Sequence, residues 1–180
     1  GEQGLAALTL EAVAAKAGCS VHSLYAAFGG RDELLYAIFE AYGPIVNIEK
    51  VISGPHGGLR ETVHKIYRLL VEALNREPRV LPAMLAATLS RPNEPSLRAF
   101  MQRFVPRMLA GVGAWLAEEV SAGRIRDLPL PLLLQQLAAP VVMHFVTRPA
   151  LQDAPGLDLP DPEEVCRVFA EAFLRAVATS

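Results

Sequence analysis

The chain has 180 residues, of which 52% are hydrophobic and 20% charged, and its formal net charge is −2. This composition is typical of a folded globular protein and excludes a largely disordered chain. Cys19 and Cys166 lie far apart, without the spacing of a metal site or the density of a disulfide framework, and the stretch GEQGLAAL is no secretory signal. We therefore expect free thiols, no metal, no cofactor and a cytoplasmic protein.

The N-terminal part of the chain predicts three short helices. An apolar stripe over 10–17 lies behind Thr9, a candidate N-cap, and Gly18 ends this helix at a position that favours a left-handed residue. Ser20 is placed to cap a second helix over 21–28. A third helix follows a pair of glycines, with acidic residues in its first turn that suit the helix dipole.

The rest of the chain predicts longer helices, so we expect an all-α fold with no strands. Apolar residues with helical spacing, or helical stretches between glycine and proline signals, occupy residues 63–74, 79–90, 96–122, 129–147 and 165–176. We expect bends where Pro106 and Pro140 remove a backbone hydrogen-bond donor.

One stretch, 128–147, contains no charged residue and approaches the length of a membrane span. Its three prolines, two glutamines and His144 are costly in lipid. A helix that is apolar all round is equally suited to burial between a core and a partner subunit. We interpret this stretch as a packed helix.

The two short helices around Gly18 match a helix-turn-helix, with Ala14 small enough for close approach and Leu24 as a buried residue of the second helix. Helical hairpins in many cores use alanine and glycine in the same way, so this skeleton alone is only moderately specific. A match over a longer stretch makes the assignment more specific. The stretch TLEAVAAKAGCSVHSLYAAFGGRDELL resembles the DNA-binding motif of the TetR family of bacterial transcriptional repressors, whose usual form is TxxxVAxxAGVSxGTLYxHFxxKxxLL. The matching positions are Val13, Ala14, Ala17, Gly18, Ser20, Leu24, Tyr25, Phe28, Leu34 and Leu35.

The resemblance implies contacts with a double-stranded DNA operator. The candidate DNA-binding residues are Thr9, Ser20, Val21, His22, Ser23, Tyr25 and Arg31. Other roles stay open for several of them: Thr9 and Ser20 also fit plain N-caps, Tyr25 a core residue, and His22 a solvated surface histidine. Because His22 and Ser23 replace the family's frequent Gly-Thr, the operator sequence is not readable. We expect Cys19 to be a buried turn residue.

The charge of the N-terminal segment is opposite to that expected for a DNA-binding head. Residues 1–42 hold Lys16 and Arg31 against five acidic residues, a net charge of −3. The resemblance implies a further helix ahead of Gly4, often preceded by a basic arm. We therefore expect the sequence to be N-terminally incomplete and the preceding residues to supply part of the phosphate-binding charge.

The resemblance also implies a division into a DNA-binding domain over 1–42 and a ligand-binding and dimerisation domain over 43–180. The second domain has apolar chemistry, and its predicted helices carry Met and aromatic side chains that suit a small hydrophobic effector, although most such residues are core in any helical bundle. The candidate ligand-binding residues are His64, Tyr67, Met84, Phe100, Phe104, Met108, Trp115 and His144.

Two helices, 129–147 and 163–178, resemble the family helices that pair across a two-fold axis, which predicts a homodimer. We therefore expect a repressor that binds a pseudo-palindromic operator as a dimer and is released by its effector. We expect no enzyme, because no nucleophile-elbow, zinc-protease or phosphate-loop motif is present. The alternative is a helical carrier of small molecules or lipids without a DNA function.

Overall fold

The computed structural model describes residues 14–15, 17–30, 33–34, 36–37, 40, 43–54, 57–76, 85–86, 88–90 and 93–179. Their regular structure is helical, and extended backbone pairs only in an isolated antiparallel bridge between Ile125 and Ala178. The expected all-α fold is confirmed.

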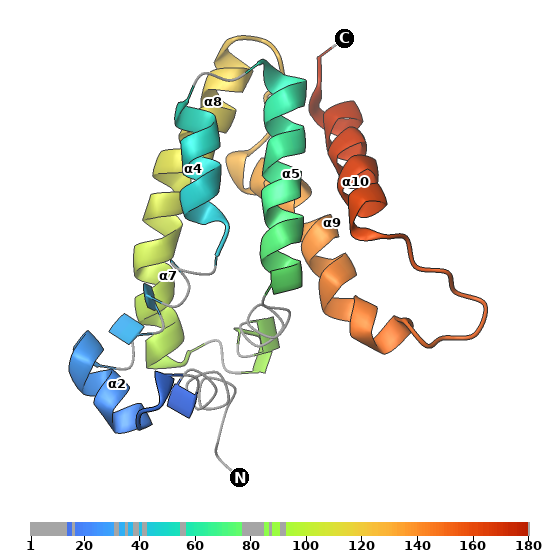
Figure 1. Ribbon diagram of the computed structural model, residues 1–180. Coiled ribbons are helices and arrows are strands. Elements are labelled where there is room, and N and C mark those ends of the chain that lie inside the picture. The colour runs from blue at the N-terminus through green and yellow to red at the C-terminus, as the bar shows by residue number, and fades with distance from the viewer. Residues whose placement is uncertain are drawn as a thin grey trace. The chain divides into compact units, whose positions relative to one another are not determined.

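The main helices follow one another along the chain (Figure 1). They are α2 (Val21–Phe28), α4 (Ile45–Ser53), α5 (Leu59–Arg76), α7 (Pro95–Met108), the π-helix η1 (Leu109–Gly113), α8 (Ala114–Ser121), α9 (Leu130–Leu151) and α10 (Pro162–Val177). The predicted helices over 63–74, 129–147 and 165–176 correspond to α5, α9 and α10. The helix predicted over 96–122 is divided into α7, η1 and α8, because the hydrogen-bonding pattern widens just after Pro106.

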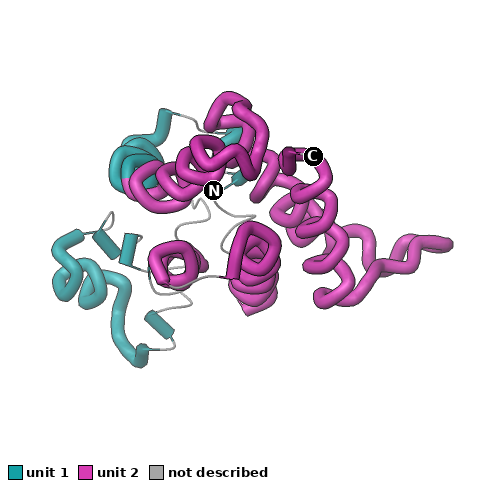
Figure 2. Tube along the Cα trace, turned by 90° about the horizontal axis from the view of Figure 1, so that it is seen from above, with its two compact units in different colours: residues 1–43, 77–106 teal, residues 44–76, 107–180 magenta. Residues whose placement is uncertain are grey.

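The chain divides into two compact units, coloured separately in Figure 2. Unit 1 contains residues 1–43 and 77–106, and unit 2 contains residues 44–76 and 107–180. The helix-turn-helix therefore shares a compact unit with a segment far away in the sequence. The predicted division at residue 42 concerns function, and it stays a prediction.

Unit 2 is built around α5, which packs against α4, α9 and α10. Val63, Ile66 and Tyr67 are completely buried, as expected from apolar residues spaced three and four apart on one helix. The ring of Tyr67 lies 6.4 Å from that of Phe173 on α10. Burial of each such side chain contributes about 1.5–3 kcal/mol to the free energy of folding.

The helix α9 has one buried face and one exposed face, although most of its residues are apolar. Its buried side chains recur four residues apart: Leu133, Leu137, Val141 and Phe145. On other faces Leu132 is 48% exposed and Met143 is 51% exposed. Among the described residues, α9 is the one helix long and apolar enough to cross a membrane, a test that core helices also pass. Its buried face shows that it packs within unit 2.

Candidate nucleic-acid interface and ligand groove

The second helix of the motif, α2, begins and ends as its sequence predicts. Ser20 is the N-cap, and its Oγ accepts a hydrogen bond of 3.0 Å from the backbone N–H of Ser23. The two serine hydroxyls are also hydrogen-bonded, 2.8 Å apart. Gly18 and Gly29 have φ values of +66° and +82°, which place both turns in the left-handed region that favours glycine.

The helix α2 presents two different faces. Leu24 is buried with Ala14 and Leu34, and Val21 and Tyr25 pack partly buried against this cluster. His22 and Ser23 are exposed on the other side of the helix. The predicted contacts Ser20, His22 and Ser23 therefore lie on accessible surface. Val21 and Tyr25 also contribute to the packing of the motif.

Some expectations for this region fall outside the described residues, namely those for Thr9 and Arg31. The expectation for Cys19 is wrong, because its side chain is exposed. The backbone explains this result: the N–H of Cys19 bonds to the carbonyl of Ala14, and the left-handed Gly18 before it turns the chain out of the helix. A turn position of this kind does not require burial.

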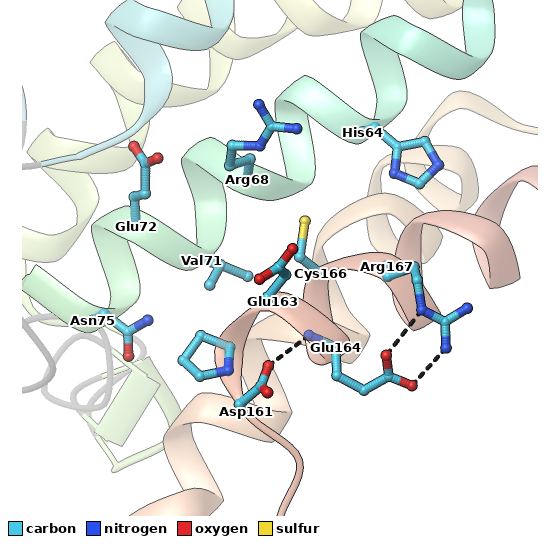
Figure 3. A pocket seen from close by; sticks show the side chains of 11 residues that line it. His64, Arg68, Val71, Glu72, Asn75, Asp161, Glu163, Glu164, Cys166 and Arg167 are labelled. Carbon is cyan, nitrogen blue, oxygen red and sulfur yellow. Dashed lines mark hydrogen bonds and ion pairs between the residues drawn. The ribbon is translucent and has the colours of Figure 1, made fainter.

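A groove of about 630 Å³ lies between α5 and α10 in unit 2 (Figure 3). Polar side chains dominate its wall, which is formed by His64, Arg68, Val71, Glu72, Asn75, Asp161, Pro162, Glu163, Glu164, Cys166 and Arg167. Glu164 forms an ion pair with Arg167, and its backbone N–H donates to the capping carboxylate of Asp161 at 2.8 Å. Burial raises the pKa of the Cys166 thiol, so this group stays protonated at neutral pH.

The predicted ligand-binding residues are spread over different parts of the structure. His64 lines the groove, where its Nε2 lies 2.8 Å from Glu171. Phe100 and Phe104 belong to unit 1 and stack on each other, with ring centroids 5.4 Å apart. Met108 ends α7 and is partly buried. Met84 lies outside the described residues.

Tyr67, Trp115 and His144 lie in unit 2 but do not line this groove. Tyr67 and Trp115 are core residues, and neither the Tyr67 hydroxyl nor the Trp115 Nε1 has a hydrogen-bond partner among the described residues. The Oγ1 of Thr62 is also buried without a hydrogen-bond partner among the described residues. Buried polar groups of this kind are normally hydrogen-bonded, so these three atoms are candidate partners for a bound molecule.

His144 on α9 lies in an aromatic environment, with ring centroids of Phe145 and Phe169 at 5.4 Å and 6.0 Å. Its Nε2 is 3.2 Å from the Nη1 of Arg148, whose other hydrogen bond goes to the Pro160 carbonyl. Burial, and then the neighbouring guanidinium, lowers the pKa of His144. The imidazole is therefore neutral at neutral pH, with a lone pair available to accept from Arg148.

Comparison with known sequences addresses the N-terminal motif. Residues 1–38 match the sequence model described as bacterial regulatory proteins, tetR family. This match covers the N-terminal segment, which contains the helix-turn-helix. No curated protein matches the chain.

Comparison with solved structures extends the similarity in fold to nearly the whole chain. A TetR family transcription regulator from Marinobacter aquaeolei VT8 is 22% identical with a TM-score of 0.62, covering 99% of this chain and 86% of that chain. A ketosteroid transcriptional regulator of Mycobacterium tuberculosis is 16% identical with a TM-score of 0.63, covering 99% and 89%. A TetR family regulator from Thermus thermophilus is 22% identical with a TM-score of 0.57, covering 97% and 91%. At these identities the likeness shows a shared fold.

The N-terminal cap of α2 generates a first prediction. Replacing Ser20 with Ala removes the acceptor for the Ser23 N–H, and we expect it to lower the free energy of unfolding of this unit by about 0.5–2 kcal/mol. Ser20→Asp keeps an acceptor and should retain most of the stability. The measurement is thermal unfolding combined with hydrogen exchange of the α2 amides. The exposed neighbour His22, changed to Ala, is the control, with an expected effect within about 0.5 kcal/mol. Equal effects of the two alanine variants would contradict the capping role.

His144 generates a pH prediction. Its pKa in the folded protein lies below the usual 6.5, so an unfolded chain takes up this proton first as the pH falls. Its contribution to stability is therefore complete above pH 6.5 and decreases as the pH falls from there toward the folded pKa. We expect His144→Gln to show a smaller loss of melting temperature between about pH 7.5 and about pH 5.5 than the unaltered protein. His22→Gln serves as the control, and an unchanged loss in His144→Gln would contradict the assignment.

Proposed function

We propose that this protein is a dimeric, DNA-binding regulator of transcription that represses at a pseudo-palindromic operator and is released by a small effector bound in unit 2. One observation carries the DNA-binding part: an N-terminal segment that matches the tetR family places a Ser20-capped helix with His22 and Ser23 on its exposed face. A helix-turn-helix of this kind reads base edges with its second helix in the major groove.

On this proposal, different residues of α2 contact different parts of the DNA. The exposed His22 contacts a base edge or the backbone, and the hydroxyls of Ser23 and Tyr25 contact phosphates, as do Thr9 and Arg31. Phosphate contacts set position and base contacts set sequence preference. The small Ala26 and Ala27 on the same helix allow its backbone to approach the bases closely, which supports a compact recognition surface.

The effector would bind in unit 2, and the structure favours one with hydrogen-bonding groups. The expectation from the sequence is a small hydrophobic molecule. The groove between α5 and α10 is lined mainly by charged and polar side chains, and the buried hydroxyls of Thr62 and Tyr67 and the indole N–H of Trp115 are without partners among the described residues. Polar or charged groups on the effector would pair with the groove wall, whereas the three buried atoms belong to residues outside it.

Dimerisation through α9 and α10 is supported by the apolar surface that these helices leave exposed. Leu132 and Met143 on α9 and Val168 on α10 are each more than 40% exposed: 48%, 51% and 41%. An isologous dimer would cover this surface. It would also present two recognition helices to half-sites about 34–36 Å apart, or a multiple of that spacing.

The DNA-binding proposal predicts specific, salt-dependent binding of the full-length chain to its own promoter region. We expect affinity for this duplex to exceed that for a scrambled duplex and to fall steeply with salt, because phosphate contacts release counterions. A His22→Ala, Tyr25→Phe double variant should bind the promoter about tenfold or more weakly. The control Leu157→Ala, in the loop before α10, should bind normally. Equal, weak binding of the unaltered protein to both duplexes would contradict the proposal and favour the small-molecule or lipid carrier.

The dimer proposal predicts opposite results for two exposed apolar residues of unit 2. Met143→Glu places a charge on the proposed interface, and we expect it to convert the dimer into a monomer. Leu157 is 45% exposed in the loop before α10, and Leu157→Glu should leave the dimer intact. Sedimentation velocity of the three proteins measures the outcome. A Met143→Glu protein that still sediments as a dimer would exclude this surface.

A further inference from the structure

The helix α7 belongs to both units, which makes it a covalent connection between DNA binding and the rest of the chain. Its residues up to Pro106 group with the helix-turn-helix in unit 1, and Arg107 begins the return to unit 2. Two other connections lie at Gly43 and Pro44, before α4, and after Arg76, at the end of α5. Side-chain contacts are described on both sides of the crossing in α7.

In unit 1, Arg103 on α7 holds the third helix of the DNA-binding motif. Its Nη1 donates to the Oε2 of Glu33 at 2.7 Å, and its guanidinium carbon lies 3.9 Å from the ring centroid of Tyr36. The Tyr36 ring is also 6.2 Å from that of Phe100, one turn earlier on α7. Because the ion pair is exposed, it adds little stability by itself, and its main effect is to fix geometry.

In unit 2, Arg107 forms a bidentate ion pair with Glu49 on α4. The Nε of Arg107 donates to Oε1 and its Nη2 to Oε2, both at 2.8 Å, and both side chains are only 27% exposed. The guanidinium lowers the pKa of the Glu49 carboxyl, so the pair stays charged at neutral pH. Two parallel hydrogen bonds of this kind define orientation as well as distance.

The backbone changes immediately after Arg107. Pro106 lacks an N–H and interrupts the helical hydrogen bonds, and α7 passes into the π-helix η1 over Leu109–Gly113. Within η1, Gly111 packs closely against Glu49: a Cβ at this position would lie 3.3 Å from the Cγ of Glu49. Gly113 similarly approaches Leu130 of α9. Glu49 therefore contacts this region in two ways. Its carboxylate pairs with Arg107 of α7, and its side-chain carbons lie close to Gly111 of η1.

From these contacts we propose that α7 transmits the state of unit 2 to the helix-turn-helix, with Glu49–Arg107 as the contact in unit 2 and Arg103 as the positioning residue in unit 1. The regulatory role rests on the proposed function. A shift of α4 or η1 alters the Glu49–Arg107 pair, and Arg103 lies one helical turn before Arg107 on the same helix. Arg103 then carries the change to Glu33 and Tyr36, and so to the packing of Leu34 against Leu24 of α2.

A first experiment tests the transmission without DNA and without an effector. Hydrogen exchange is measured on the full chain for the unaltered protein, Glu49→Ala, Arg103→Ala and the control Glu61→Ala, which breaks the exposed ion pair with Lys65 in unit 2. We expect exchange in residues 20–40 to rise at least about threefold in both Glu49→Ala and Arg103→Ala, and to stay unchanged in Glu61→Ala. A change in Glu49→Ala confined to peptides of unit 2 would overturn the proposal.

A second experiment measures affinity for the promoter duplex. Arg98→Ala is the matched control for Arg103→Ala, because Arg98 lies on the same helix, carries the same charge, and donates hydrogen bonds to the nearby Asn93. We expect Arg103→Ala to bind about tenfold more weakly than Arg98→Ala, and Arg103→Lys, which keeps the charge opposite Glu33, to recover most of the affinity. A salt slope lower by about one than that of the unaltered protein would instead make Arg103 a direct phosphate contact and overturn the positioning role.

The double variant completes the test. If α7 couples the two contacts, the losses of promoter affinity in Glu49→Ala and Arg103→Ala are not independent. The affinity loss of the double variant then differs from the product of the two single losses by at least about threefold. Multiplicative losses would overturn the proposal even if DNA binding itself is specific. If the unaltered protein shows no specific DNA binding, the proposed function fails, and the exchange experiment still decides whether α7 couples the units.

Discussion

The apolar face of α5 is the constraint on which unit 2 depends. Val63, Ile66 and Tyr67 are completely buried, and Val71 and Leu74 continue the face toward the end of the helix. This face must be covered on several sides, which is achieved by α4, α9 and α10. The phase of the same helix then places Arg68 and Glu72 in the wall of the groove beside α10. The helical period of α5 therefore positions both the core residues and the residues in the wall of the groove.

Among the described residues, the buried cluster of the helix-turn-helix contains Ala14, Leu24 and Leu34, with Val21 and Tyr25 partly buried against it. Contacts from elsewhere in unit 1 also bear on its geometry. Arg103 of α7 supplies such contacts to Glu33 and Tyr36. The acidic character of the N-terminal segment is also locally reduced, since the guanidinium offsets the charge of Glu33.

The helix α9 shows how one apolar sequence serves two surfaces. Its buried face completes the core of unit 2, while Leu132 and Met143 remain largely exposed. Helical structure continues through Pro140, whereas after Pro106 it changes to the wider π pattern. The π-helix also contains Gly111 and Gly113, which pack closely against Glu49 and Leu130. Proline alone does not decide how a helix is altered.

The sequence by itself determined the local features of this protein: the helical periods of α5 and α10, the Ser20 cap, the left-handed Gly18 and the helix-turn-helix motif. These follow from residue types at short spacing, where backbone sterics and capping act within a few positions. Only the tertiary structure decided that Phe100 and Phe104 lie in unit 1 while His64 lines a polar groove in unit 2, and that Glu49 pairs with Arg107. Periodicity identifies a face that must be buried, but the partner of that face is selected by packing between segments far apart in the chain.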